Sequence, residues 1–415
     1  MSGSATAERA AGVVTGCGTV GAGSDCGRAM GGRPVLGRDV MVLGKRVAGA
    51  TLRPPPARPL RAGAGPVDVT SAGRHPQPGD TYAGVMTNLE TRPQEQVCLT
   101  GPGTSAVELI EPRDVPLGGP RAMTVRRTLP SKQRSLIGAF CFADHYGPDD
   151  ISASGGMDVP PHPHAGLQTV TWLFEGQVLH QDALGSVQTI QPGQLNLMTA
   201  GNGICHSEEG TLRRFPAQGR LHGVQLWTAL PDADRAGERA FEHVADVPVF
   251  DIDGARVQVF MGTLGGVTSP ARAYSPLVAA QLDIPAGARV RLPVDGAFEH
   301  GILLDGGDLT VDGTAVPEAW LAYLAPGPGE ILLEAGEAPV RAVLMGGVPF
   351  GEQVLMWWNF VTRTHEEVLT ARAQWQAAIA GEPEGVARFG RVTGYDGAPL
   401  PAPELPQVRL KPRAR

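Results

Sequence analysis

Two pairs of residues with metal-ligating side chains stand out in the middle of the sequence. His162 and His164 are separated by one residue, and so are His206 and Glu208. In a β-strand, residues i and i+2 project from the same face, so each pair can direct two ligands at one point. Three imidazoles and one carboxylate form a mixed nitrogen and oxygen set, which suits first-row metals and differs from the thiolate set of a closed structural zinc site. These residue types predict a redox-active or Lewis-acid metal centre.

The sequence between the two pairs has the pattern of strands joined by turns. Residues 169–174 and 186–190 contain β-branched and aromatic side chains, and glycine or proline follows each segment. Such a segment can fold back and bring the two pairs together. An isolated His-x-His is also common on solvated strand faces, so the metal hypothesis depends on this return of the chain.

A later strand-like segment, residues 220–231, carries two further candidates. If one of its faces lines the metal cavity, His222 or Gln225 can orient a ligand through a hydrogen bond. The alternative is a core strand with one solvated polar face. His145 precedes a Gly-Pro turn, where a structural or solvated role is favoured over a role in the site.

The composition predicts a mainly β protein. Glycine (56 residues) and proline (37) are enriched, while aromatic residues make up only 5% of the chain. Such a composition favours many turns and short elements. Short strand-like segments between residues 275 and 345 predict a second small barrel or sandwich. Similar sequences at residues 173–176 and 303–306 suggest an internal duplication. The second block has no His-x-His, so we expect no metal there.

One helix is predicted, at about residues 364–380. Thr364 and Glu367 match a capping box, and Gly381 supplies a stop. The expected buried stripe is formed by Val368, Leu369, Trp375 and Ile379.

Charge and cysteine usage restrict the function and the compartment. The formal net charge is −7, and residues 86–415 alone carry 25 Lys and Arg against 37 Asp and Glu. This acidity argues against direct binding to nucleic acid. No apolar run approaches the roughly 18 residues of a membrane span. The five cysteines are scattered and lack a C-x-x-C motif, so we expect a cytoplasmic protein that does not bind membranes.

The first 85 residues differ from the rest of the chain. They are rich in Gly, Ala, Arg and Pro, and they contain no Trp or Phe with which to build a core. We expect them to be disordered, and we hypothesise that translation begins at Met86. An anion-binding basic tail is the other interpretation of this segment.

Several motifs together resemble the pirin family of bicupins. The resemblance covers roughly residues 105–380 and rests on Pro161-His-Pro-His-Ala-Gly-Leu-Gln-Thr-Val-Thr171, His180-Gln-Asp182 and Met198-Thr-Ala-Gly-Asn-Gly-Ile-Cys-His-Ser-Glu208. It implies two tandem cupin β-barrels of the jelly-roll type with a C-terminal helix. It also implies an iron site in the first barrel. Carried over residue by residue, the ligands fall on His162, His164, His206 and Glu208.

The resemblance also gives the expected domains. Residues 1–94 form a disordered or wrongly included extension, and residues 95–232 form the metal-binding cupin domain. Residues 233–395 form a degenerate C-terminal cupin domain that includes the helix, and residues 396–415 form a flexible tail.

One position departs from the wider cupin pattern. Many cupins place a metal-binding carboxylate four residues after the second histidine, where this chain has the neutral Gln168. The resemblance implies that pirins do not use that position, so the ligand set of three histidines and Glu208 stands. Gln168 remains a candidate to orient a ligand.

The resemblance implies an iron-dependent dioxygenase that uses O2 and acts on a flavonol-like phenol, as a quercetin 2,3-dioxygenase does. Fe(II) is the favoured metal, with Mn, Ni and Cu as alternatives. Glu208 would serve both as a ligand and as the catalytic base that accepts the 3-hydroxyl proton. Two other functions stay open: a non-catalytic, redox-sensing iron protein that binds a protein partner, and a Lewis-acid enzyme such as an isomerase.

Overall fold

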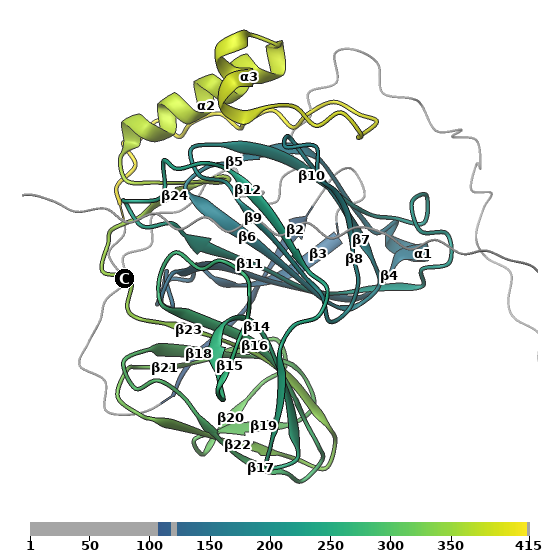
Figure 1. Ribbon diagram of the computed structural model, residues 1–415, viewed down its shortest axis with the longest axis vertical. Coiled ribbons are helices and arrows are strands. Elements are labelled where there is room, and N and C mark those ends of the chain that lie inside the picture. The colour runs from purple at the N-terminus through teal and green to yellow at the C-terminus, as the bar shows by residue number, and fades with distance from the viewer. Residues whose placement is uncertain (1–106, 118–122, 413–415) are drawn as a thin grey trace, which may run out of the picture. The chain divides into compact units, whose positions relative to one another are not determined.

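The computed structural model describes residues 107–117 and 123–412 of the 415-residue chain. Most regular structure in this part is β-strand, arranged as two barrels, and two helices follow the second barrel (Figure 1). This confirms the mainly all-β, double-barrel fold that the resemblance implied. The expected extension of residues 1–94, together with the hypothetical start at Met86, lies outside the described residues.

The first barrel is formed by two antiparallel sheets. The larger sheet has seven strands, in the order β12 (Ala240–Val244), β9 (Leu195–Thr199), β6 (Leu167–Glu175), β11 (Arg220–Ala229), β4 (Phe140–Asp150), β3 (Met123–Leu129) and β2 (Arg113–Leu117). The smaller sheet has the order β5 (Met157–His164), β10 (Ile204–Gly210), β7 (Val178–Asp182) and β8 (Val187–Ile190). A short helix, α1 (Ile151–Ser154), connects β4 to β5.

The second barrel is built in the same way. Its larger sheet has the order β1 (Glu108–Ile110), β21 (Leu321–Leu324), β18 (Glu299–Gly306), β23 (Val340–Gly347), β16 (Leu277–Ile284), β14 (Ala255–Leu264) and β13 (Val249–Ile252), and β15 (Val267–Thr268) also pairs with β14. Its smaller sheet has the order β17 (Arg289–Pro293), β22 (Glu330–Ala335), β19 (Leu309–Val311) and β20 (Thr314–Val316).

The strand order of the first barrel is repeated in the second. The sequence β9-β6-β11-β4 in the first large sheet corresponds to β21-β18-β23-β16 in the second, and β5-β10-β7-β8 corresponds to β17-β22-β19-β20. The repetition supports the internal duplication that the sequence suggested.

The edge strands move the domain limits away from the expected ones. Strand β1, which lay in the expected first domain, pairs with β21 of the second barrel. Strand β12, which lay in the expected second domain, pairs with β9 of the first barrel. The expected boundary between residues 232 and 233 therefore does not separate the two barrels, because each barrel takes one strand from the other side of it.

A shared core lies between the two large sheets. Trp172 of the first barrel stacks on Phe260 of the second, with ring centroids 4.5 Å apart. The Trp172 Nε1 group donates a hydrogen bond of 2.8 Å to Gln281 Oε1. Because burial of a single large apolar side chain stabilises a fold by about 1.5–3 kcal/mol, this core ties the barrels together.

The segment after the second barrel returns to the first. It consists of β24 (Leu355–Trp357), β25 (Phe360–Thr362), α2 (His365–Ala380) and α3 (Pro383–Phe389). Phe360, Trp375 and Phe389 pack against Ala165 and Cys205 of the first barrel. The helix that we expected as part of the C-terminal cupin domain thus covers the first barrel, on the side of β5 and β10 (Figure 1).

Helix α2 begins and ends as the sequence predicted. The Thr364 side chain accepts a hydrogen bond from the Glu367 amide at 3.2 Å, and Gly381 ends the helix with φ 83°. The expected buried stripe was wrong in part, because Leu369 and Ile379 are 41% and 36% exposed. The stripe that is buried runs through Val368, Ala371, Trp375 and Ala378, which follow one face at helical spacing.

Part of the expected flexible tail is packed. The Leu400 amide donates a hydrogen bond of 2.8 Å to Pro161 O, and Leu400 O accepts one of 2.8 Å from Trp375 Nε1. Leu400 and Ala402 are both buried. The chain therefore stays attached to the first barrel beyond residue 396.

Within the described ranges, the helices are too short or too polar to cross a lipid bilayer.

Candidate metal centre

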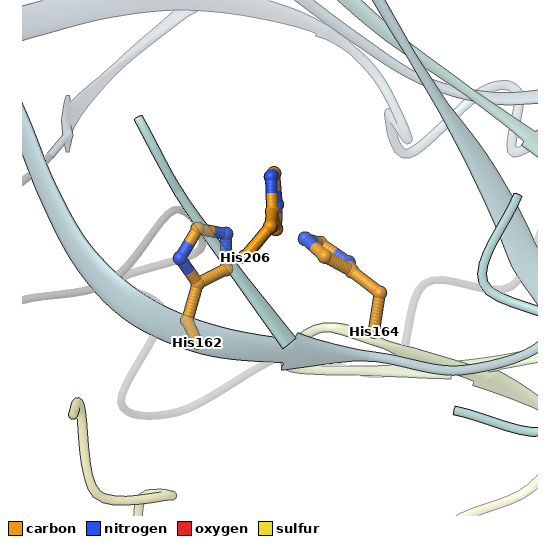
Figure 2. A group of neighbouring side chains, drawn as sticks. All are labelled: His162, His164 and His206. Carbon is orange, nitrogen blue, oxygen red and sulfur yellow. The ribbon is translucent and has the colours of Figure 1, made fainter. Parts of the chain in front are cut away.

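Three of the four predicted ligands meet inside the first barrel. One ring nitrogen each of His162, His164 and His206 lies within 4.8 Å of the other two, and all three side chains are buried (Figure 2). The strand register explains the meeting. His162 on β5 lies directly opposite His206 on β10, and His164 lies two residues further along β5 on the same face.

The hydrogen bond of His162 fixes its tautomer. The Nδ1 atom lies 2.9 Å from Pro160 O, and a carbonyl oxygen can only accept, so Nδ1 carries the proton. The Nε2 atom then presents a lone pair. It is buried and has no hydrogen-bond partner among the described residues.

A short relay fixes His206 in the same way. His180 Nε2 lies 3.1 Å from Asp182 Oδ2, so this nitrogen donates and His180 Nδ1 is left to accept. His206 Nδ1 lies 3.3 Å from His180 Nδ1 and therefore carries the donated proton. The lone pair of His206 is thereby placed on Nε2, which has no partner in the described part of the chain. A carboxylate behind a ligating histidine is a common arrangement in metal sites.

His164 takes its support from the segment after the second barrel. It forms a hydrogen bond with the backbone of Asn359, which lies between β24 and β25. Its Nδ1 atom is buried and has no partner among the residues that the structure describes.

The charge state of the three rings fits a metal. Burial lowers the pKa of His162 to about 4 and the pKa values of His164 and His206 well below the ordinary value. The rings are therefore neutral, and neutral imidazole is the form that ligates metals. Buried nitrogens without partners otherwise cost free energy. Three convergent lone pairs on fixed rings fit a first-row divalent cation.

Glu208 lies beside this cluster rather than within it. A register shift between His206 and Glu208 in the pairing of β10 with β5 offsets the two side chains. Burial raises the pKa of Glu208 to about 7, against the opposing effect of hydrogen bonds with Thr171 and Gln225. Thr171 Oγ1 lies 3.5 Å from Glu208 Oε1. Glu208 lines the same cavity as His162 and His164, and its role as fourth ligand stays a prediction.

The cavity between these residues is small and has an apolar wall. Its volume is about 10 Å³, which is room for about one water molecule. Phe142 and Trp227 stack at 4.0 Å along one side, and Leu117 and Met157 also line the space. The described residues thus enclose the cluster, with apolar side chains along one side of the cavity.

Comparison with known proteins identifies the family of this chain. Residues 122–228 match the family model "Pirin", and residues 279–381 match "Pirin C-terminal cupin domain". A Pseudomonas aeruginosa protein named "Putative quercetin 2,3-dioxygenase" is 42% identical over 300 residues, which cover 72% of this chain and 91% of that protein. The chain belongs to the pirin family.

Further pirin relatives cover the same region. A pirin-like protein of Caulobacter vibrioides is 36% identical over 260 residues, or 61% of this chain and 88% of that one. The crystal structure of a quercetin 2,3-dioxygenase from Acinetobacter baumannii has 40% sequence identity and a TM-score of 0.67, and the match covers 73% of this chain and 97% of that one.

The three candidate orienting residues of this pirin lie in different places. Gln225 accepts a hydrogen bond of 3.1 Å from Thr171 and lines the cavity with Glu208. Gln168 is buried in a separate network, where it donates to Thr199 Oγ1 at 2.9 Å. His222 belongs to a second cluster at the junction of the barrels.

Sequence reasoning gave no site role to several residues that the pirin fold brings together. His180 and Asp182, which support His206, share the i and i+2 spacing of the ligand pairs, so this signal could have found them. His145 and Asp305 join His222 in the second cluster. Asp305 lies in the second barrel, and no spacing in the sequence connects it to the two histidines.

Proposed function

We propose that this pirin is an iron-dependent dioxygenase that acts on a flavonol-like phenol, as a quercetin 2,3-dioxygenase does. The observation that carries the proposal is the convergence of three neutral histidine nitrogens beside a buried carboxyl group. The names of the relatives from Pseudomonas and Acinetobacter support the same activity.

The metal would be held by His162, His164 and His206, with Glu208 as the proposed fourth ligand. Iron(II) is our proposed metal, because a nitrogen and oxygen donor set suits it, and Mn, Ni or Cu would be accommodated by the same donors. When bound, the metal supplies a Lewis acid for the phenol oxygen and a redox centre for O2.

Glu208 is the group that we assign to proton transfer. In the metal-free chain burial raises its pKa to about 7, and a bound cation would favour the carboxylate, which is the form that accepts a proton. Its carboxylate would take the proton of the phenol 3-hydroxyl group. Thr171 and Gln225 form hydrogen bonds with it and would keep it oriented. The stacked Phe142 and Trp227 would exclude water from the reacting atoms.

The volume of the cavity sets a condition on this function. Sites for small-molecule ligands usually measure about 300–1,000 Å³, and the cavity beside the histidines measures about 10 Å³. A flavonol therefore enters only if the apolar wall that includes Leu117 and Met157 moves.

The test is oxygen uptake by the iron-loaded full chain with quercetin as the probe. We expect quercetin-dependent O2 consumption by the wild type, loss of at least about 100-fold in His162→Ala, and retention in His300→Gln. His300 is the matched control, because it is a buried histidine of the second barrel outside both histidine clusters. Absence of quercetin-dependent uptake in iron-replete protein would contradict the proposal.

The alternative of a non-catalytic redox regulator makes a different prediction. Such a protein would hold iron in the same site, would consume no O2 with any phenol, and would bind a protein partner in one oxidation state only. Oxygen uptake therefore separates the two functions, and the relatives' names favour the enzyme.

A further inference from the structure

A second cluster of metal-ligating side chains lies where the two barrels meet. His145 on β4 and His222 on β11 come from the first barrel, and Asp305 on β18 comes from the second. Asp305 Oδ1 lies 2.6 Å from the Nε2 atom of each histidine, and the two Nε2 atoms are 3.3 Å apart. All three side chains are buried.

The distance between the two histidine nitrogens matches a zinc site, whereas their distances to the carboxylate are those of hydrogen bonds. Two nitrogens bound to a tetrahedral zinc at about 2.0–2.1 Å are about 3.3 Å apart, and the two Nε2 atoms already have that separation. The carboxylate oxygen is closer than a shared metal would allow, so Asp305 would have to retreat by less than about 1 Å for a cation to enter.

The surroundings define the charge of the cluster. Arg341 Nη1 lies 3.3 Å from Asp305 Oδ2, which leaves Oδ1 facing the histidines. Burial lowers the pKa of His145, so its ring is neutral; Nε2 donates its proton to Asp305 Oδ1, and a metal bound at Nε2 would require the other neutral tautomer, with the proton on Nδ1. Its Nδ1 atom is buried, and no acceptor among the described residues fixes its tautomer from the far side. Phe174 packs its ring edge-on against His222, with centroids 5.0 Å apart.

Solvent reaches the edge of this cluster. A cavity of about 620 Å³ is lined by Asp305 and Arg341, together with Arg256 and Asp283 of the second barrel. Asp305 is therefore both a member of the buried cluster and a wall of an open cavity. The lining of this cavity includes none of the three histidines of the first centre.

We propose that His145, His222 and Asp305 form a second divalent metal site, for zinc or a cation of similar preference, which joins the two barrels. Two imidazoles and one carboxylate are an established zinc ligand set that leaves a position for water. The site differs from the three-histidine centre in its location, since it takes ligands from both barrels. It does not depend on the proposed dioxygenase activity.

Zinc stoichiometry of the full chain tests the proposal. The chain is stripped with a chelator, titrated with Zn(II) against a chromophoric competitor, and measured for bound zinc after desalting. We expect two equivalents for the wild type and one for Asp305→Asn or His222→Gln. The His162→Ala/His164→Ala double variant should also keep one equivalent, held by the second site.

Further substitutions in the double variant test whether the zinc that it retains is bound by His145, His222 and Asp305. Adding Asp305→Asn to the double variant should reduce binding from one equivalent to none, whereas adding His300→Gln should leave one. Circular dichroism checks that each chain is folded. The proposal is overturned if the folded double variant binds no zinc, or if Asp305→Asn and His222→Gln leave the wild-type stoichiometry unchanged. If the double variant does not fold, the stoichiometries of the wild type and the single variants decide the question alone.

Discussion

The two barrels share a strand order but differ in the residues that face each other across the smaller sheet. In the first barrel, β5 and β10 place His162 opposite His206. In the second barrel, the corresponding strands β17 and β22 place Leu292 opposite Ile331 and Val290 opposite Leu333. The four residues of the second barrel are fully buried in an aliphatic core.

This contrast separates what the fold provides from what the side chains provide. Both barrels supply two facing strands whose inward residues converge. In the first barrel these positions hold imidazoles whose buried Nε2 atoms have no partner among the described residues, which costs free energy unless another group binds them. The second barrel uses the same positions to stabilise the fold. Function in this duplicated fold therefore lies in a few inward residues.

Removal of a proposed metal ligand from the first barrel should have the largest effect. We expect His162→Ala to lower the iron content from about one per chain to a small fraction. The loss of affinity should exceed the 10–100-fold loss that is typical when only a residue supporting a ligand is changed. Iron is measured by mass spectrometry after desalting. If the His162→Ala variant kept its iron, this histidine would not hold the metal, and the contrast between the two barrels would be wrong.

The same truncation in the second barrel should affect stability instead. Leu292→Ala leaves a cavity in an aliphatic core and should lower the free energy of unfolding by about 2–5 kcal/mol, measured in denaturant. Under native conditions the variant should keep its iron. Iron loss equal to that of His162→Ala would mean that the two interiors are not independent.

The buried carboxyl group of the first barrel should make stability depend on pH. Burial raises the pKa of Glu208 from 4.5 to about 7, so between these values the folded chain holds a proton that the unfolded chain has lost. In the metal-free protein, Glu208 contributes about 3 kcal/mol to the free energy of unfolding below pH 4.5. This contribution is lost as the pH rises through 7.

Glu208→Gln removes that contribution. The nearby histidines have lowered pKa values and act in the opposite direction, so the informative quantity is the difference between wild type and variant. We expect the variant to gain stability relative to the wild type between pH 5 and pH 8, followed by denaturant unfolding. An unchanged difference over that range would show that the carboxyl group is not buried as described.

The relay behind His206 should have the smallest effect of the four. His180→Ala removes the acceptor that holds the proton on His206 Nδ1, and should weaken metal binding by about 10–100-fold while leaving all three ligands in place. His180→Gln keeps an acceptor and should recover part of the affinity. A competition titration with a chelator measures both. Equal affinities for wild type and His180→Ala would show that the relay does not orient the ligand.

Much of this organisation could be predicted from local sequence. The i and i+2 spacing of His162 and His164 indicated two ligands on one strand face, and turn residues indicated that the chain returns to His206. The capping box at Thr364 and the stop at Gly381 located α2. These features depend on residues that are neighbours along the chain, where spacing determines geometry.

Features that depend on distant parts of the chain could not be predicted. The register shift beside Glu208, which offsets it from His206, follows from how β10 pairs with β5 and has no sequence signature. The pairing of β1 with the second barrel and the return of α2 to the first both depend on which apolar surfaces would otherwise be exposed to solvent. The meeting of His145 and His222 with Asp305 likewise depends on the packing of one barrel against the other.

The most direct test of the three-histidine centre is anomalous diffraction at the iron edge from crystals of the iron-loaded full chain. We predict a strong anomalous peak within coordination distance of His162 Nε2, His164 Nδ1 and His206 Nε2, which are the nitrogens left with lone pairs. Absence of anomalous density between these three atoms in crystals of iron-containing protein would contradict the account.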